Sequence, residues 1–521
     1  MNVSRRQFIA LGAGTLAAVS GGCDGVKDAR NELFRFVGKP AAPPLEGSLE
    51  APQSAEIDEV SHVVARLTFG ARPGDYARVK AMGIERFVEE QLDPERIADT
   101  QSERAVRHQY SALEDPESRL FPRKGDQHDP LQQLFPALRD RGARVGDLYE
   151  YKEKVLLHEL TGATVLRAVL SRRQLFEGMV HFWSDHFNID PSKGECKWLK
   201  AADDRDVIRA HALGGFREML RASAVSPAML WYLDGRVNQK KEPGDEPNEN
   251  YARELMELHT LGVHGGYSQH DVMEVARCLT GWTVRDKQRF FKGRVEFHEE
   301  LHDRGAKRVL GQEIAAGGGA RDLDQVLDIL VSHPSTAHYI AWKLCRRFIA
   351  DEPPANAVKV TAKAFADSKG NIPATLRALF ATSEFRGVEF RASKFKRPFQ
   401  FVVSSLRAAN AETDVSPQLV EYLLRLGHAP FRYPTPDGYP EESTHWQSTL
   451  LWRWNFAAAL ADNQIKGTRI DFEGLRARVG GDEALMATFL GRTASEAEQN
   501  AYRQSGSGLA LLIASPAFQR C

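Results

Sequence analysis

Three segments of the chain concentrate residues that could hold a metal ion or transfer protons. The first, residues 181–187, reads HFWSDHF and places two histidines among aromatic side chains. At about 100° per residue, a helix would put His181 and Asp185 on one face, with His186 about 140° away from His181. Imidazoles are common metal ligands, and a carboxylate beside them often orients the ring. The alternative, which spacing alone favours, is that the aromatic residues form core and the histidines bind backbone groups.

The second segment, residues 248–262, predicts a helix with polar residues that can cap its start and a glycine, Gly262, that can end it. Glu254 and Glu257 are three positions apart and therefore share a face of that helix. Two close carboxylates favour a shared proton, a raised pKa or a bound cation. The alternative is an exposed acidic face whose charge is balanced by Arg253.

The third segment, residues 298–307, reads HEELHDRGAK and predicts a loop. His302 beside Asp303 suits metal ligation or acid–base chemistry, and loops held by a scaffold often carry such groups. Lys307 adds a positive charge that could stabilise a developing negative one. The alternative is an ordinary turn, because His, Asp and Gly are also common turn residues.

Composition and absent motifs exclude several classes of function. The 521 residues include 69 Lys and Arg against 70 Asp and Glu, so the net charge of -1 gives no reason to expect nucleic acid as a partner. The five cysteines are too few for a disulfide framework and show no Cys-x-x-Cys zinc spacing. The sequence also lacks a dinucleotide-binding glycine motif, a phosphate loop, a His-Glu-x-x-His pair and a Gly-x-Ser-x-Gly elbow.

The first 23 residues predict an export signal. Arg5 and Arg6 precede the apolar stretch 8–19, which is too short to span a bilayer and resembles the twin-arginine type of signal. Cys23 follows small residues, as in a lipoprotein cleavage site, so lipidation of Cys23 and simple cleavage nearby are both open. Lipidation would be the only route to the membrane. Residues 24–56 are rich in Pro, Gly and Ser and predict a linker.

The elements that must position the three segments are predicted to be helices. From residue 57 to residue 521 the apolar residues recur mainly at spacings of three and four, so we expect a mainly α fold, one large multi-helical body. A small β excursion is expected near residues 290–314, with a strand at 290–297 that could pair with 308–314. Residues 115–127 and 238–247 are interpreted as surface insertions.

At these segments the chain resembles the bacterial domain of unknown function 1800 family. The similar strings are HFWSDHF, NENYARELMELHTLGVHGGYSQHDVMEVARCLTGW, HDRGAKRVLG, HVVARLTFGARPGDYARV, KRPFQFVVSSLRA and LGHAPFRYPTPDGYPEESTHWQSTLLWRWNF, which together span residues 60–460. Asp185 stands where the family pattern suggests Asn, and Tyr439 where Trp is commoner. The residues that match the family motifs are His181, His186, Arg253, Glu254, Glu257, His302, Asp303 and Lys307, whereas His259 and His298 match less distinctively.

The resemblance implies an exported protein without an established activity, often encoded beside an exported sulfatase-related protein that is a candidate partner. The favoured hypothesis is a metal-dependent hydrolase of the periplasm or envelope acting on a glycan or other extracytoplasmic polymer. In it, His181, His186 and His302 bind zinc, iron or manganese. The catalytic groups would be Glu254, Glu257, Asp303, Arg253 and Lys307.

Two alternatives remain open. A metal-free enzyme would use Glu254 and Glu257 as a carboxylate pair, although their spacing is tight for a glycosidase. A non-catalytic protein would bind a co-exported partner or polymer, and its polar motifs would be buried networks that specify helix packing. In the enzymatic hypotheses all three motifs are expected to converge on one site.

Overall fold

The computed structural model describes residues 42–110, 113, 145–242, 244–285 and 293–521, with backbone only for 145–155. The predicted export signal, Cys23, most of the linker and the insertion at 115–127 lie outside these residues. The expected mainly α fold is confirmed. Within the described residues, no helix is long and apolar enough to cross a membrane.

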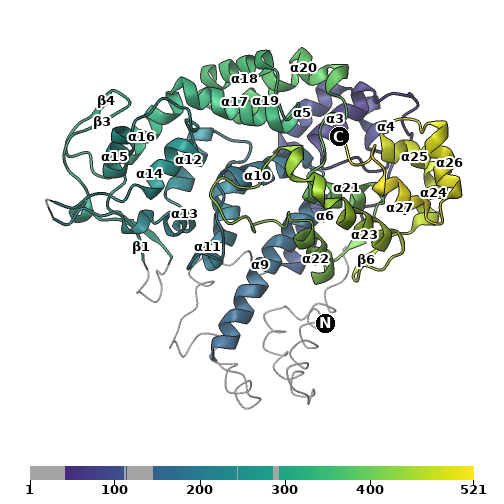
Figure 1. Cartoon of the computed structure of the whole chain (residues 1–521), viewed down its shortest axis with the longest axis horizontal. Coiled ribbons are helices and arrows are strands. Elements are labelled where there is room, and N and C mark those ends of the chain that lie inside the picture. Colours follow the sequence, from purple (N-terminus) through teal and green to yellow (C-terminus); the bar gives the residue numbers. More distant parts are fainter. Residues whose placement is uncertain (1–41, 111–112, 114–144, 243, 286–292) are drawn as a thin grey trace.

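The first and last helices of the described residues lie side by side at one end of the molecule (Figure 1). A contact between distant segments joins them there, since the Thr493 amide donates to the Ser54 carbonyl at 2.8 Å. The N-terminal helices are α3 (Glu59–Leu67), α4 (Asp75–Met82), α5 (Ile84–Leu92), the 3-10 turn Pro94–Arg96 and α6 (Thr100–Gln109). The C-terminal helices are α24 (Phe472–Val479), α25 (Asp482–Leu490), α26 (Glu496–Gln504) and α27 (Gly508–Ala514).

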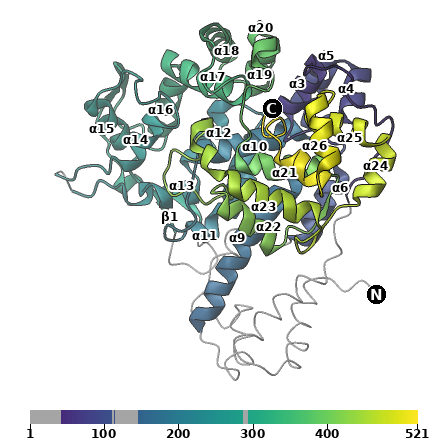
Figure 2. The ribbon, with the colours of Figure 1, turned by 45° about the vertical axis from the view of Figure 1, so that its right-hand side comes forward.

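The opposite end carries the second and third motifs, as a turned view also shows (Figure 2). Its helices are α14 (Asn250–Glu257), α15 (Gln269–Cys278) and α16 (Arg321–Ser332), with a 3-10 turn at Glu299–Leu301. The strands are β1 (Trp282–Val284), β2 (Val295–Phe297), β3 (Lys307–Val309) and β4 (Gln312–Ile314). Helix α14 ends five residues before the predicted stop, and Gly262 instead adopts a positive φ of 79° beyond it.

The small β part lies where it was expected, but its strands pair differently. β2 pairs with β1, with Trp282 opposite Phe297, and β3 pairs with β4, with Lys307 opposite Ile314. The predicted pairing of 290–297 with 308–314 is therefore wrong, and residues 290–292 lie outside the described part. Leu310 and Gly311 both have positive φ, as a two-residue hairpin turn requires, so 307–314 forms a hairpin by itself.

Helices of the middle of the chain connect the two ends. The central ones are α9 (Val145–Leu170), α10 (Gln174–His186), α11 (Cys196–Asp203), a π-helical turn (Asp204–Arg209), α12 (Phe216–Ala224), α13 (Pro227–Tyr232) and the turn Gly235–Val237. Across the top of Figure 1 run α17 (Pro334–Phe348), α18 (Ala355–Asp367), α19 (Ile372–Phe380), α20 (Ser383–Arg386) and the turn Val388–Phe390. The remaining elements are α21 (Pro398–Ala408), β5 (Glu412–Thr413), α22 (Pro417–Arg425), the turns Ser443–His445 and Gln447–Thr449, α23 (Leu450–Ala461) and β6 (Thr468–Arg469), which pairs with β5.

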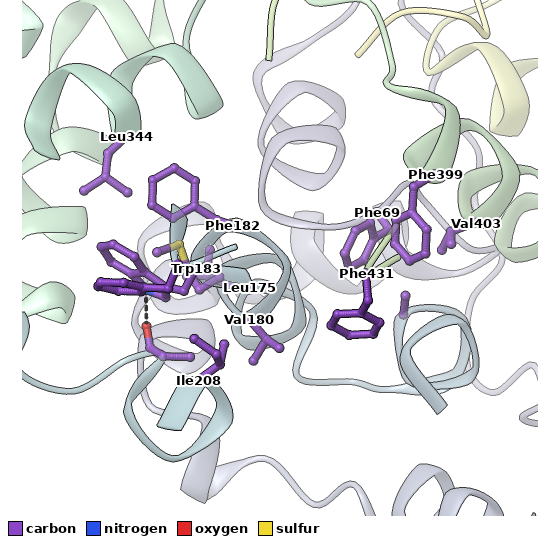
Figure 3. Packing of buried hydrophobic residues seen from close by; sticks show 14 of the residues in the cluster. Phe69, Leu175, Val180, Phe182, Trp183, Ile208, Leu344, Phe399, Val403 and Phe431 are labelled. Carbon is purple, nitrogen blue, oxygen red and sulfur yellow. Dashed lines mark hydrogen bonds between the residues drawn. The ribbon is translucent and has the colours of Figure 1, made fainter. Parts of the chain in front are cut away.

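One apolar core extends from α3 to α27, and α10 lies within it. Trp183 is fully buried, and its indole N–H donates to the Ala212 carbonyl at 3.0 Å (Figure 3). Phe182 lies near Leu344 of α17, and Phe399 of α21 packs beside Phe69 (Figure 3). Because α10 is fixed by apolar contacts on several sides, the polar residues at its C-terminal end have defined positions.

Candidate functional site

The first two motifs meet at Lys343 of α17. The Lys343 ammonium lies 3.0 Å from Nδ1 of His186, at the end of α10. The other ring nitrogen of His186, Nε2, lies 3.1 Å from the carbonyl oxygen of His259, just beyond α14. A carbonyl can only accept, so Nε2 carries the proton and Nδ1 accepts from the ammonium. His186 therefore joins the two motifs and orients Lys343.

Burial perturbs the ionisation of both partners. Burial, and then the nearby Lys343 charge, lower the pKa of His186 well below its ordinary value, so the ring is neutral. Burial also lowers the pKa of Lys343 to about 8, against the opposing effects of Asp185, Glu441 and Asp437. Lys343 as a whole residue is half-buried.

Carboxylates of α14 and of the segment 432–446 form an acidic wall of the same site. Burial, followed by the charge of Glu257, raises the pKa of Glu254, and Asp437 adds to this effect. Glu257 accepts a hydrogen bond from the Tyr267 hydroxyl at 3.5 Å. Asp437 also raises the pKa of Lys343, so the Glu254 carboxylate and the amine share this charged neighbour. We call Lys343, His186, Glu254, Glu257 and Asp437 the central site.

Tyr339, one turn before Lys343, lies at the centre of this arrangement. Its ring is 5.5 Å from the Lys343 amine. A Cβ added to Gly262 would come within 2.9 Å of the same ring, so glycine is required for this close approach. Burial, and then Glu257 and Asp437, raise the pKa of Tyr339 to about 12. The hydroxyl therefore remains protonated at neutral pH and is able to donate.

An arginine-centred network holds the other side of α10. Arg397 donates to Asp185 at 2.8 Å and to Nδ1 of His181 at 3.2 Å, and it forms an ion pair with Glu441 at 3.2 Å. Burial raises the pKa of Asp185 to about 6, although Arg397 opposes the shift. Burial and then the Arg397 charge lower the pKa of His181 well below its ordinary value. Because its Nδ1 accepts from a guanidinium, His181 is a neutral member of this network.

The segment 432–446 touches α10 at Gly438. The φ of this residue is 72°, and a Cβ there would come within 2.1 Å of the Asp185 carbonyl oxygen. Only glycine permits this backbone contact, which carries Asp437 toward Lys343 and Glu441 toward Arg397. The contact thus positions one residue of the central site and one of the arginine network.

The third motif forms a separate buried network. Lys307 lies 2.5 Å from Asp322 of α16, and Nε2 of His302 lies 3.1 Å from the same carboxylate oxygen. These three side chains have no exposed surface. Asp303 accepts two hydrogen bonds of 3.0 Å from Arg277. Burial alone would raise the pKa of Asp303, but the bonds to Arg277 outweigh burial and lower this pKa to about 2. Among the described residues, no hydrogen bond or ion pair joins this network to the central site, so the contacts bring together two of the three motifs rather than all three.

Two further residues lie outside the central site. Arg253 bonds to Glu249 at 3.0 Å and to Gln269 at 2.8 Å at the surface of α14. His298 is exposed beside Glu300 at 3.1 Å. Neither residue contacts Lys343 or His186 in the described part of the chain.

The three histidines expected as metal ligands do not fit one metal ion. His181 and His186 each direct a ring nitrogen at a cationic side chain, which disfavours a second cation there. His302 has Asp322 at one nitrogen and the Thr280 carbonyl, at 2.9 Å, at the other. Across the ranges described, no group of three or more His, Cys, Asp or Glu side chains could hold a metal ion. We therefore assign no metal to these residues.

Sequence reasoning missed several residues of the site. Asp437, Arg397 and Glu441 belong to family-like strings in which no role had been assigned. Lys343 belongs to an ordinary amphipathic helix, and nothing in its local sequence indicates a function. Its partner His186 is 157 positions away. Such contacts depend on tertiary packing rather than on local pattern.

Comparison with known families accounts for nearly the whole chain. A family model described as "Protein of unknown function (DUF1800)" matches residues 62–520. The chain therefore belongs to this family, which confirms the resemblance found in its motifs. A search of curated proteins and a search of solved structures found no match.

Proposed function

We propose that this DUF1800 protein is a hydrolase that acts on a glycan or other extracytoplasmic polymer at the central site. One observation carries the proposal: Glu254 has a raised pKa, while Lys343, which shares the charged neighbour Asp437 with it, has a pKa lowered to about 8. Catalytic acids and bases need pKa values shifted toward the working pH, and groups shifted in opposite directions can divide the two roles.

The residues support a metal-free acid–base mechanism. Protonated Glu254 donates its proton to the leaving oxygen as the scissile carbon–oxygen bond breaks. Asp437 accepts a proton from the attacking water, whose oxygen forms the new bond to the same carbon. Lys343, oriented by neutral His186, donates to the oxygen on which negative charge develops. Because Glu254 and Asp437 come from different segments, this pairing avoids the tight spacing of Glu254 and Glu257 on one helix.

The test is hydrolysis of a panel of bacterial polysaccharides and peptidoglycan by the purified protein, measured by release of reducing ends. We expect Glu254→Gln to lower the rate by about 10²-fold, a typical contribution of a general acid. Glu249→Gln, at the half-buried N-cap position of the same helix, is the matched control and should leave the rate unchanged. Binding of a polymer without any turnover would contradict the proposal and favour the non-catalytic binding protein.

We also propose that the protein acts outside the cytoplasm, because Arg5 and Arg6 precede a short apolar stretch. Replacing both arginines by lysine is expected to leave the protein in the cytoplasmic fraction, as fractionation and immunoblotting would show. The same replacement of Arg30 and Arg35 serves as the control and should not alter export. Normal export of the first variant would refute the assignment. Cys23→Ala, fractionated in parallel, tests lipid attachment.

A further inference from the structure

A second charged site lies away from the central site, beside the N-terminal helices. A cavity of about 200 Å³ is lined by residues at the start of α4, just after the end of α9, on α21 and at 43–46. Four arginines and two carboxylates belong to its lining: Arg72, Arg78, Arg172, Arg407, Glu46 and Asp75. The cavity shares no residue with the central site.

Arg407 and Asp75 make a fixed wall of this cavity. The buried Arg407 guanidinium donates to the Gly70 carbonyl at 2.7 Å and to the Val169 carbonyl at 3.0 Å. Its remaining nitrogen lies 3.1 Å from Asp75, which also accepts from the Arg72 amide at 2.8 Å. Asp75 therefore balances one of the arginine charges and holds the loop before α4.

The charges of Arg72 and Arg172 are not balanced in this way. The Arg72 guanidinium donates to the Pro43 carbonyl at 3.1 Å and to the Asn410 side chain at 2.5 Å, which are neutral acceptors. In the part of the chain that the structure describes, the exposed Arg172 guanidinium has no ion-pair partner. By contrast, Arg78 forms an ion pair with Glu90.

This crowding of positive charge is unfavourable for the arginines. Burial lowers the pKa of Arg72. The Asp75 carboxylate opposes this shift, and the smaller effect of the Arg172 charge adds to it. Burial similarly lowers the pKa of Arg407 to about 10, with Arg72 contributing. An anion between these guanidinium groups would relieve their repulsion and replace the water they lose on burial.

We propose that this cavity binds a phosphate group of a small phosphorylated molecule or lipid, held by Arg72 and Arg172. Guanidinium groups match the geometry of phosphate oxygens and can donate two parallel hydrogen bonds to them. Arg407 positions the wall through its three fixed bonds and adds positive potential. Residues 43–46 line the cavity, so an occupied site also fixes the end of the linker. This inference does not rest on the proposed hydrolase.

The probes are inorganic phosphate, glycerol phosphate and vesicles of phosphatidylglycerol, each added to the full-length protein at constant ionic strength. Calorimetry and thermal unfolding measure binding of the soluble probes, and co-sedimentation measures binding of vesicles, with phosphatidylcholine as the reference. Saturable binding of either soluble probe supports a free phosphorylated ligand. Binding of the vesicles alone supports a lipid headgroup.

Substitutions distinguish the cavity from general charge attraction. We expect Arg172→Gln and Arg72→Gln each to weaken binding at least tenfold, which corresponds to about 1.4 kcal/mol. Arg172 is exposed and its side chain makes no hydrogen bond or ion pair within the described residues, so Arg172→Gln should fold normally. Arg321→Gln, an exposed arginine on α16, is the charge-matched control and should bind like the wild type. Absence of binding to all three probes, or equal loss in the control, would overturn the proposal.

Discussion

Replacing Lys307 by methionine is expected to lower the free energy of unfolding by about 3–5 kcal/mol. The Lys307 ammonium and the Asp322 carboxylate are 2.5 Å apart, and neither side chain has exposed surface. Removing the ammonium leaves the carboxylate buried beside His302 without its cationic partner. Water cannot solvate that charge without opening the core between β3 and α16. Denaturant unfolding at pH 7, followed by circular dichroism, measures the effect.

Two further variants make this prediction specific. Lys363→Met removes an exposed lysine that pairs with Asp367 on α18, and exposed pairs contribute little. It should leave the unfolding midpoint nearly unchanged. A double variant, Lys307→Met with Asp322→Leu, should recover much of the loss, because an apolar pair strands no charge. A loss below about 1 kcal/mol for Lys307→Met would mean that the network is hydrated and not structural.

The helical class of this fold could be predicted because apolar residues recur in the sequence at the spacing of an amphipathic helix. The apolar repeats at 323–330 and 419–426 correspond to α16 and α22, each of which buries one face. Strand pairing was less predictable. Residues 307–314 turn back on themselves at Leu310 and Gly311, and the non-glycine residue with positive φ gives no hairpin signal in the sequence.

The candidate site was predictable only in part, for a physical reason. The composition of the motifs identified His186 and Glu254 as candidate site residues. It did not indicate whether a charged side chain is exposed or buried. His302 and Lys307 had the same types and spacing as catalytic residues, yet their common partner Asp322 makes them a closed network. The partner lies on a later helix, and no local pattern connects it to the motif. Lys343 was missed for the same reason.

Replacing Lys343 by methionine is expected to lower polymer hydrolysis by about 10²–10³-fold, the loss found when a donor to a developing negative charge is removed. The amine carries the positive charge that stabilises a developing negative one only while it is protonated, and burial lowers its pKa to about 8. Activity of the wild type should therefore fall as the pH rises above 8. Lys343→Arg keeps a positive charge at this position, so the decrease in its activity should begin at a higher pH than in the wild type. Lys359→Met, an exposed lysine on α18, is the matched control.

A second measurement on the same variant does not depend on any substrate. His186 is kept neutral first by burial and then by the Lys343 charge. Removing that charge takes away one of the causes and leaves burial, so the pKa of His186 should rise toward its ordinary value without reaching it. Nuclear magnetic resonance titration of the imidazole measures this shift in wild type and Lys343→Met. An unchanged pKa would show that the two groups are not coupled. If Lys343→Met shows the shifted His186 pKa but keeps full activity, the contact between the two residues is real and Lys343 takes no part in the catalytic step.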